Sequence, residues 1–221
     1  MKNNKMIKDI VKFVFGLFAM GLGVALVTKS QLGTSSITSV PYVISMISPL
    51  SLGLLVLLTC AFFLLIQIVI LKKDFQKKQY LQLIVGPIFG LFVDLGMYLF
   101  NFVNPTSYIV KVIALLLGCI VLAYGIYLQI SAKVIINPAE GLVIVIAQKL
   151  GKEFGIVKII FDFTLIFIAL AISLYSLGSV QGVREGTIIS AFLVGYIIRI
   201  FNRIAQHVRN KKLEVQEAIT S

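Results

Sequence analysis

The chain has 221 residues, of which 59% are hydrophobic and only 13% are charged, and its mean hydropathy is +1.02. A soluble domain of this size carries roughly 25% charged residues, so the composition excludes an ordinary soluble protein. Its apolar runs reach the roughly 20 residues that a helix needs to cross the hydrocarbon core, which predicts an all-α integral membrane protein.

The formal net charge of +11 suggests nucleic-acid binding, but the placement of the basic residues argues against it. The lysines and arginines lie between and beside the apolar runs and form no basic domain. This arrangement is typical of residues that orient spans and contact lipid headgroups. We therefore expect membrane lipids, and no nucleic acid, among the partners.

The apolar runs, taken in chain order, predict six membrane-spanning helices and two shorter segments. The six spans cover about residues 10–28, 50–71, 80–102, 108–130, 154–177 and 187–205. The two shorter segments, 36–48 and 138–150, follow the first and the fourth spans. A helix of about 13 residues reaches only about 20 Å, whereas the hydrocarbon core is about 30 Å thick. We therefore expect both short segments to be re-entrant half-helices.

The distribution of basic residues decides between six spans and eight. With six spans, most lysines and arginines, including those of the loop KKDFQKK at 72–78, lie on the side of both termini. If both short segments crossed the membrane fully, that loop would move to the opposite side. The positive-inside rule therefore favours six spans, with both termini in the cytoplasm.

Two stretches of the chain share one design, in which a polar break follows an apolar run. Residues 23–42 read GVALVTKSQLGTSSITSVPY, and residues 125–144 read GIYLQISAKVIINPAEGLVI. They align at a constant offset of 102 positions, which also matches Gly53 to Gly155. Three spans per copy is an odd number, so the second copy is inserted upside down relative to the first, as in many secondary transporters.

We therefore divide the chain into two inverted three-span repeats within one membrane domain. The first repeat covers residues 1–104, and the second covers 105–206. The remaining residues, 207–221, form a charged cytoplasmic tail. Small-residue patterns such as Gly86-xxx-Gly90 suit internal packing and a homodimer equally well, so a homodimer stays open.

The two polar breaks are the candidate binding site, because polar, irregular backbone within a membrane is tolerated only when it packs in protein or lines a wet cavity. Half-helix N-termini also present free N–H groups, which attract anions. The candidate substrate-binding residues are Lys29, Ser30, Gly33, Thr34, Ser35, Ser36, Thr38, Asn137, Glu140 and Gly141.

Structural roles compete with binding at some of these residues. Asn137, Pro138 and Glu140 are typical of a helix start, with Asn as the N-cap, Pro at the first helical position and Glu in the first turn. Glu140 then does no more than stabilise the helix dipole. Lys29 is either a counter-charge for a substrate or an anchor that extends its amine to the membrane surface.

Asp94 and Asp162 are the candidate ion-coupling residues, because an ionisable group inside a span is costly and marks a pathway or a buried partner. For Asp94 the alternative is a structural partner or a position near the membrane surface. Asp162 follows Lys158 by four residues, a spacing that suits an ion pair within one helix. A mutually neutralised pair is therefore the alternative to a proton or cation site. Gln67 and Gln129 are further polar groups in or near spans.

Three segments resemble motifs of one protein family. They are SQLGTSSIT at 30–38, VGPIFGLFVD at 85–94 and EGTIISAFLVG at 185–195, and they are similar to motifs of bacterial YczE/YyaS/YitT-type membrane proteins. The resemblance covers nearly the whole chain and departs from the family pattern at Pro87, where a threonine is usual. It implies a multi-pass protein of the bacterial cytoplasmic membrane and implies no particular activity.

The sequence contains no constellation of nucleophile, base and oxyanion donor and no phosphate-binding glycine loop, so we do not expect an enzyme. Cys60 and Cys119 lie in apolar runs, where cysteine behaves as a small hydrophobe. His207, in the basic tail, has no partner cluster. We expect no metal and no other cofactor.

The inverted repeat and the paired breaks indicate a secondary transporter or permease for a small polar solute, anionic or zwitterionic, coupled to a proton or a sodium ion. The alternative is a non-transporting membrane partner that assists assembly, secretion or lipid organisation. A passive channel is less favoured, because nothing resembles a filter or a ring of charges. A transporter needs its breaks to be reachable from water, whereas a partner protein packs them dry.

Overall fold

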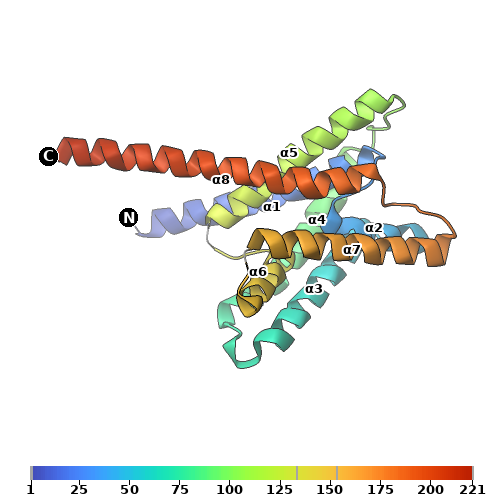
Figure 1. Cartoon of the computed structure of the whole chain (residues 1–221), viewed down its shortest axis with the longest axis horizontal. Helices are drawn as coiled ribbons and strands as arrows, with labels where there is room; N and C mark the ends of the chain where they lie inside the picture. The colour runs from blue at the N-terminus through green and yellow to red at the C-terminus, as the bar shows by residue number, and fades with distance from the viewer. Residues whose placement is uncertain (1, 133, 153, 221) are drawn as a thin grey trace.

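The computed structural model describes residues 2–132, 134–152 and 154–220, and these residues form helices and connecting loops with no strand among them (Figure 1). Two short 3-10 turns, η1 (Lys72–Asp74) and η2 (Lys77–Leu81), connect the third helix to the fourth. The helices are α1 (Lys2–Lys29), α2 (Ser36–Ile47), α3 (Leu52–Leu71), α4 (Gln82–Leu99), α5 (Tyr108–Ala132), α6 (Pro138–Leu150), α7 (Phe154–Leu177) and α8 (Glu185–Thr220).

Within the described residues, five helices are long and apolar enough to cross a membrane: α1, α3, α4, α5 and α7. Their outward faces carry large apolar side chains, such as Phe62 (59% exposed) and Phe167 (67% exposed), which suit contact with lipid. The fold is therefore that of an all-α integral membrane protein. The sixth expected span, 187–205, falls within α8, and two of its side chains, at 202 and 205, lie outside the described residues, so the count of six stays a prediction.

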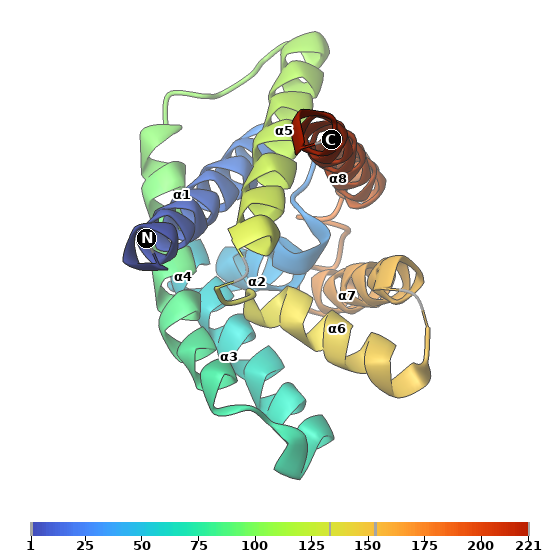
Figure 2. The ribbon, with the colours of Figure 1, turned by 90° about the vertical axis from the view of Figure 1, so that its left-hand side faces the viewer.

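The helices pack in a pattern that relates the two halves of the chain. α1 lies between α4 and α5, and α5 in turn contacts α8 (Figure 2). Of its neighbours, α2 packs most extensively against α7, and α6 packs most extensively against α3. Each short helix therefore packs mainly against a long helix of the other half. The start of α1 and the end of α8 lie at the same end of the molecule (Figure 1).

Glycines bring α1 and α5 into close antiparallel contact. A Cβ atom on Gly16 would lie 2.9 Å from the carbonyl oxygen of Gly125, and one on Gly118 would lie 3.2 Å from that of Gly23. A Cβ atom on Gly23 would lie only 2.5 Å from the backbone nitrogen of Leu122. Because small residues allow two helix backbones to approach each other, these glycines set the spacing of the two helices that precede the polar breaks.

Local signals in the sequence explain where the short helices begin. The Asn137 side chain accepts a hydrogen bond from the Ala139 N–H at 3.3 Å, and Pro138 is the first residue of α6, which confirms the predicted helix start. Ser35 precedes α2 in an extended conformation, with φ −71° and ψ 153°. Before it, Gly33 has φ +122°, a conformation that favours glycine and turns the chain away from α1.

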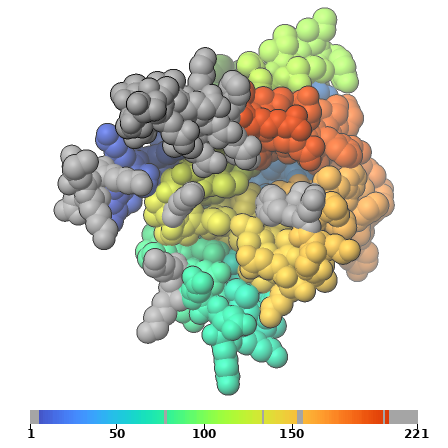
Figure 3. All heavy atoms as spheres, turned by 60° about the vertical axis from the view of Figure 1, so that its left-hand side comes forward, coloured from blue at the N-terminus to red at the C-terminus, as the bar shows by residue number. Residues whose placement is uncertain are grey.

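Each short helix begins in the interior and ends at the surface. Ser36, the first residue of α2, is 5% exposed, whereas Ile47, its last residue, is 44% exposed. In α6, Glu140 is 1% exposed and Leu150 is 62% exposed. Figure 3 brings the end with the chain termini forward and shows the gold atoms of α6 and α7 at the surface, between α3 and α8.

Candidate functional site

The first polar break forms a buried network of hydroxyl groups. The side chain of Thr34 is 2.8 Å from the hydroxyls of both Thr28 and Thr38, and Thr38 is 2.8 Å from Ser35. Helix α8 closes the network, because the Thr34 N–H donates to Thr187 Oγ1 at 3.1 Å. Every hydroxyl named here is buried and has a protein partner, so the network is internally satisfied.

The other candidate residues of the first break have local partners. The Lys29 ammonium donates to Asn101 Oδ1 at 3.0 Å, just beyond the end of α4. The Ser30 hydroxyl donates to the Val27 carbonyl oxygen at 2.6 Å. Gly33 lies directly against the Thr187 hydroxyl, which leaves no room for a side chain. Ser36 is buried at the start of α2.

The second break is held in place by three glutamine side chains, all buried. Gln67 Nε2 on α3 donates to the Pro138 carbonyl oxygen at 2.9 Å and to Gln82 Oε1 at 3.0 Å. The Asn137 N–H donates to Gln129 Oε1 on α5 at 3.4 Å. A Cβ atom on Gly141 would lie 3.0 Å from Gln67 Oε1, so glycine allows this glutamine to pack against the first turn of α6.

The sequence alone did not identify this glutamine cluster. Gln67 and Gln129 were recognisable as polar groups in or near spans, but their partners were not, and Gln82 was not singled out at all. A buried amide in an apolar run is costly unless it is hydrogen-bonded, and this cost is the available signal. The partners lie on α4, α5 and α6, which only the folded arrangement brings together.

Glu140 is the exception in this cluster, because its charge has no partner. It is 1% exposed, and both of its carboxylate oxygens lack a hydrogen bond. The Nε2 atom of Gln129, at the same break, is also buried without a partner. Among the described residues, Glu140 and Gln129 are the buried side chains around α6 whose polar atoms lack a hydrogen-bond partner. Buried polar groups normally have such partners, so the first turn of α6 is a candidate site for a ligand or a proton.

Both candidate ion-coupling residues, Asp94 and Asp162, have partners within the protein. Lys158 forms an ion pair with Asp162 one turn further along α7, and this confirms the predicted pair. Glu140 lies within electrostatic range of both of these charges. Asp94 instead receives hydrogen bonds from the Gly53 N–H at 2.7 Å and from the Ser51 hydroxyl at 2.6 Å, at the start of α3. The structure therefore brings Asp162 close to Glu140 and places the Asp94 side chain, from α4, at the start of α3.

Side chains of both short helices belong to one apolar cluster. Ile37 and Val40 of α2 and Ala139 and Leu142 of α6 belong to one group of packed side chains, together with Leu165 of α7. The hydroxyl network and the glutamine cluster are thus linked by apolar packing. No group of three or more His, Cys, Asp or Glu side chains that could hold a metal ion occurs among the residues that the structure describes.

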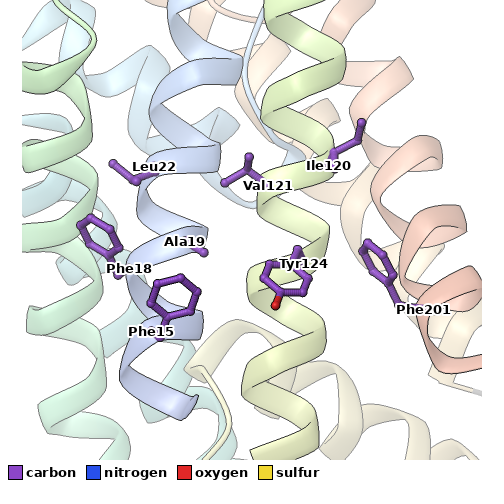
Figure 4. A pocket seen from close by; sticks show the side chains of 8 residues that line it. All are labelled: Phe15, Phe18, Ala19, Leu22, Ile120, Val121, Tyr124 and Phe201. Atoms are coloured by element: carbon purple, nitrogen blue, oxygen red, sulfur yellow. The ribbon is translucent and has the colours of Figure 1, made fainter. Parts of the chain in front are cut away.

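Two surface hollows lie outside this cluster. One, of about 310 Å³, is lined by Gly33, Tyr42 and Arg184 at the end of the molecule where α1 ends and α8 begins. The other, of about 330 Å³, is an apolar groove between α1, α5 and α8, where Phe15, Tyr124 and Phe201 lie (Figure 4). The first borders Gly33 of the first break, and the second suits lipid contact.

Comparisons with known proteins support the conclusion that the chain is a membrane protein. A family model described as "Family of unknown function (DUF6198)" matches residues 7–203. The chain is also 30% identical, over 112 residues, to the "Uncharacterized membrane protein YczE" of Bacillus subtilis (strain 168). That match covers 50% of this chain and 47% of the relative, so the chain spans about half the length of this relative. No solved structure matches the chain. The resemblance to YczE-type proteins is confirmed.

Proposed function

The chain belongs to the DUF6198 family, and we propose that it is a secondary transporter or permease that moves a small polar solute, anionic or zwitterionic, across the bacterial cytoplasmic membrane. The observation that supports the proposal is that each short helix packs mainly against a long helix of the other half, which we call the exchange pattern of the helix contacts. α2 packs against α7 as α6 packs against α3, and α1 contacts α5 at the centre. Two inverted repeats are expected to pack in this way, and secondary transporters are commonly built from such repeats.

The positions of equivalent residues support the inverted repeat. Helices α2 and α6 start 102 residues apart, as do α3 and α7, in agreement with the offset of the sequence alignment. The contact of Gly16 with Gly125 has a counterpart in the contact of Gly118 with Gly23. Adding 102 to 16 gives 118, and subtracting 102 from 125 gives 23, so the offset converts one contact into the other, as an in-plane two-fold relation requires.

The burial of the short helices supports re-entrant segments. α2 and α6 each start in the interior and end at the surface, so each can return to the side from which the chain entered. With both ends of the chain at one end of the molecule, an even number of crossings follows, and six is the number that we propose. The solute then binds where the interior starts of α2 and α6 approach each other, at the midplane.

A second candidate function rests on the hydroxyl network. The network around Thr34 is buried and fully hydrogen-bonded within the protein, which is what dry packing of the first break requires. This observation favours a non-transporting membrane partner that assists assembly, secretion or lipid organisation. In that case Ser35 and Thr38 serve packing alone.

A ligand screen tests the transporter proposal. Purified protein is heated with small carboxylates, amino acids, amines, vitamins and inorganic anions, and its melting temperature is recorded. A ligand at 100 times its Kd stabilises the native state by about 2.7 kcal/mol, which shifts the melting temperature measurably. The expected result is stabilisation of the wild type by one class of solute, with a weaker shift in Glu140→Gln and Ser35→Ala. A flat profile across the panel contradicts the proposal.

Cysteine labelling separates the two candidate functions. Ser36→Cys and Ala139→Cys place a thiol at the start of each short helix, and the native Cys60 and Cys119 are buried, so background labelling stays low. A transporter exposes each position to water in one of its states, so both thiols react with a small polar reagent in membranes. A dry-packed partner protein leaves both thiols unreactive in native membranes and reactive only after denaturation.

A further inference from the structure

The charges beside the start of α6 do not balance. Glu140 and Asp162 contribute two carboxylates, whereas Lys158 contributes one ammonium group, which is already paired with Asp162. Asp162 is 4% exposed and Glu140 is 1% exposed, so water does not screen them. If both carboxylates were ionised, one negative charge would remain in the interior without a counter-charge, at a large energetic cost.

The helices packed against α6 supply no further positive charge among their described residues. α3 contributes the thiol of Cys60, which lies within electrostatic range of Glu140, and the amide of Gln67. α4 contributes the amide of Gln82, and α7 contributes the Lys158–Asp162 pair. The amide of Gln129 reaches the same break from α5. All of these groups except the ion pair are neutral.

A proton is the ligand that fits this arrangement. A divalent metal ion requires several oxygen ligands, and the described residues contain no cluster of three acidic, histidine or cysteine side chains. A single proton neutralises one carboxylate and needs no further ligand. It also turns one of the two unpartnered carboxylate oxygens into a hydrogen-bond donor.

We propose that Glu140 is a proton-exchange site, protonated in the closed arrangement of the structure and deprotonated when its surroundings open to water. This inference rests on the proposed transport function and deepens it, because it assigns the coupling ion and the residue that carries it. The proton leaves the Glu140 carboxyl for a water molecule on the side to which the site opens. Because α6 begins in the interior and packs against α3 and α7, water reaches Glu140 only when its first turn moves relative to these helices.

Infrared spectroscopy tests the proposal without any knowledge of the solute. A protonated carboxylic acid has a carbonyl stretching band that is separate from the bands of carboxylates and amides and shifts in heavy water. We expect wild-type protein in lipid to show such a band, which decreases as the pH is raised. Glu140→Gln should lose the band, whereas the matched control Asp94→Asn should keep it, because Asp94 accepts hydrogen bonds from Ser51 and Gly53.

Two results would overturn the proposal. One is a band that persists in Glu140→Gln, and the other is wild-type protein without any band that titrates between acidic and alkaline pH. If Glu140→Gln does not fold, the wild type in sodium-free buffer decides the matter. Loss of the band on addition of sodium ions at constant pH then identifies a sodium site instead, while a band insensitive to sodium supports the proton.

The infrared experiment tests the proton site and the ligand screen tests solute binding, so either proposal can fail while the other holds. A titrating Glu140 band with a flat ligand screen supports the proton site and counts against solute transport. Binding of a solute with no Glu140 band supports transport and overturns the proton assignment. Where a solute is found, the accumulation that a pH gradient drives in proteoliposomes should fall at least tenfold in Glu140→Gln.

Discussion

Three carboxylates in or beside the spans of this chain have different surroundings, and the surroundings separate their roles. Asp94 accepts two hydrogen bonds at the start of α3, and Asp162 pairs with Lys158. Glu140 has neither a hydrogen bond nor a counter-charge of its own. The first two carboxylates therefore stabilise the fold as it stands, whereas the third requires a ligand or a proton.

Replacing Asp94 should lower stability and leave the proton site unchanged. Asp94→Ala removes the acceptor for the Gly53 N–H and the Ser51 hydroxyl, and loss of such a cap costs about 0.5–2 kcal/mol. We expect a lower melting temperature in Asp94→Ala and also in Ser51→Ala, because the Ser51 hydroxyl both donates to Asp94 and accepts from the Leu54 N–H as the N-cap of α3. An unchanged melting temperature in Asp94→Ala would contradict the capping role.

Removing one member of the Lys158–Asp162 pair should be more harmful than removing both. Lys158→Met leaves the carboxylate of Asp162 buried beside Glu140 without its counter-charge, which costs about 3–5 kcal/mol. The double variant Lys158→Met/Asp162→Leu removes the stranded charge and should recover most of the loss. Thermal unfolding of the two single variants and the double variant measures the coupling. Additive losses would show that the pair contributes no coupling energy.

The partners of these polar residues show where prediction from sequence ends. The Lys158–Asp162 pair and the Asn137 cap are local, with spacings of four residues or fewer, and the sequence predicted both. The bonds from Gln67 to Pro138 and from Gly53 to Asp94 span 71 and 41 positions. No local rule specifies such contacts, because they depend on how the helices pack.

At the scale of elements, the boundaries of the short helices were largely predictable. The sequence predicted segments at 36–48 and 138–150, and the helices run over Ser36–Ile47 and Pro138–Leu150. The Asn137 cap and Pro138 mark the start of α6, and such signals act within one helical turn. The contact between α1 and α5 was less accessible, because the glycines that permit it are spread over two helices that are distant in the sequence.

The glycine positions at the α1–α5 contact should tolerate no larger residue. Gly23→Ala would place a Cβ atom 2.5 Å from the backbone nitrogen of Leu122, so the two helices must move apart at a cost of about 1–3 kcal/mol. Gly195→Ala in α8 is the matched control, because nothing lies within 4 Å of the new Cβ atom. Alanine is also the better helix former there, by up to about 1 kcal/mol.

Thermal unfolding in the same lipid or detergent compares these two glycine variants. We expect Gly23→Ala to melt below the wild type and Gly195→Ala to melt at or above it. Equal melting temperatures for Gly23→Ala and the wild type would mean that α1 and α5 are less closely packed than the structure indicates. A loss of stability in Gly195→Ala would instead point to a partner surface on α8.

At the scale of the whole molecule, the exchange pattern of the helix contacts links the fold to the proposed transport function. Because α2 packs on α7 and α6 packs on α3, a movement of one half relative to the other displaces both polar breaks at once. The apolar cluster that includes Ile37, Val40, Ala139 and Leu142 joins side chains of both short helices to α3 and α7. Under the proposed transport function, such a movement would change the exposure of both breaks, as alternating access requires.

The six-span arrangement makes a prediction about two loops that eight spans would reverse. Six spans place the loop at Lys72–Asp74 in the cytoplasm and the loop at 104–107 outside, whereas eight spans exchange their sides. Lys73 and Ser107 are both exposed, so Lys73→Cys and Ser107→Cys each present a thiol at the surface. In intact cells, a membrane-impermeant thiol reagent should label Ser107→Cys at once and Lys73→Cys only after the membrane is permeabilised. Labelling of Lys73→Cys in intact cells would contradict six spans with both termini in the cytoplasm.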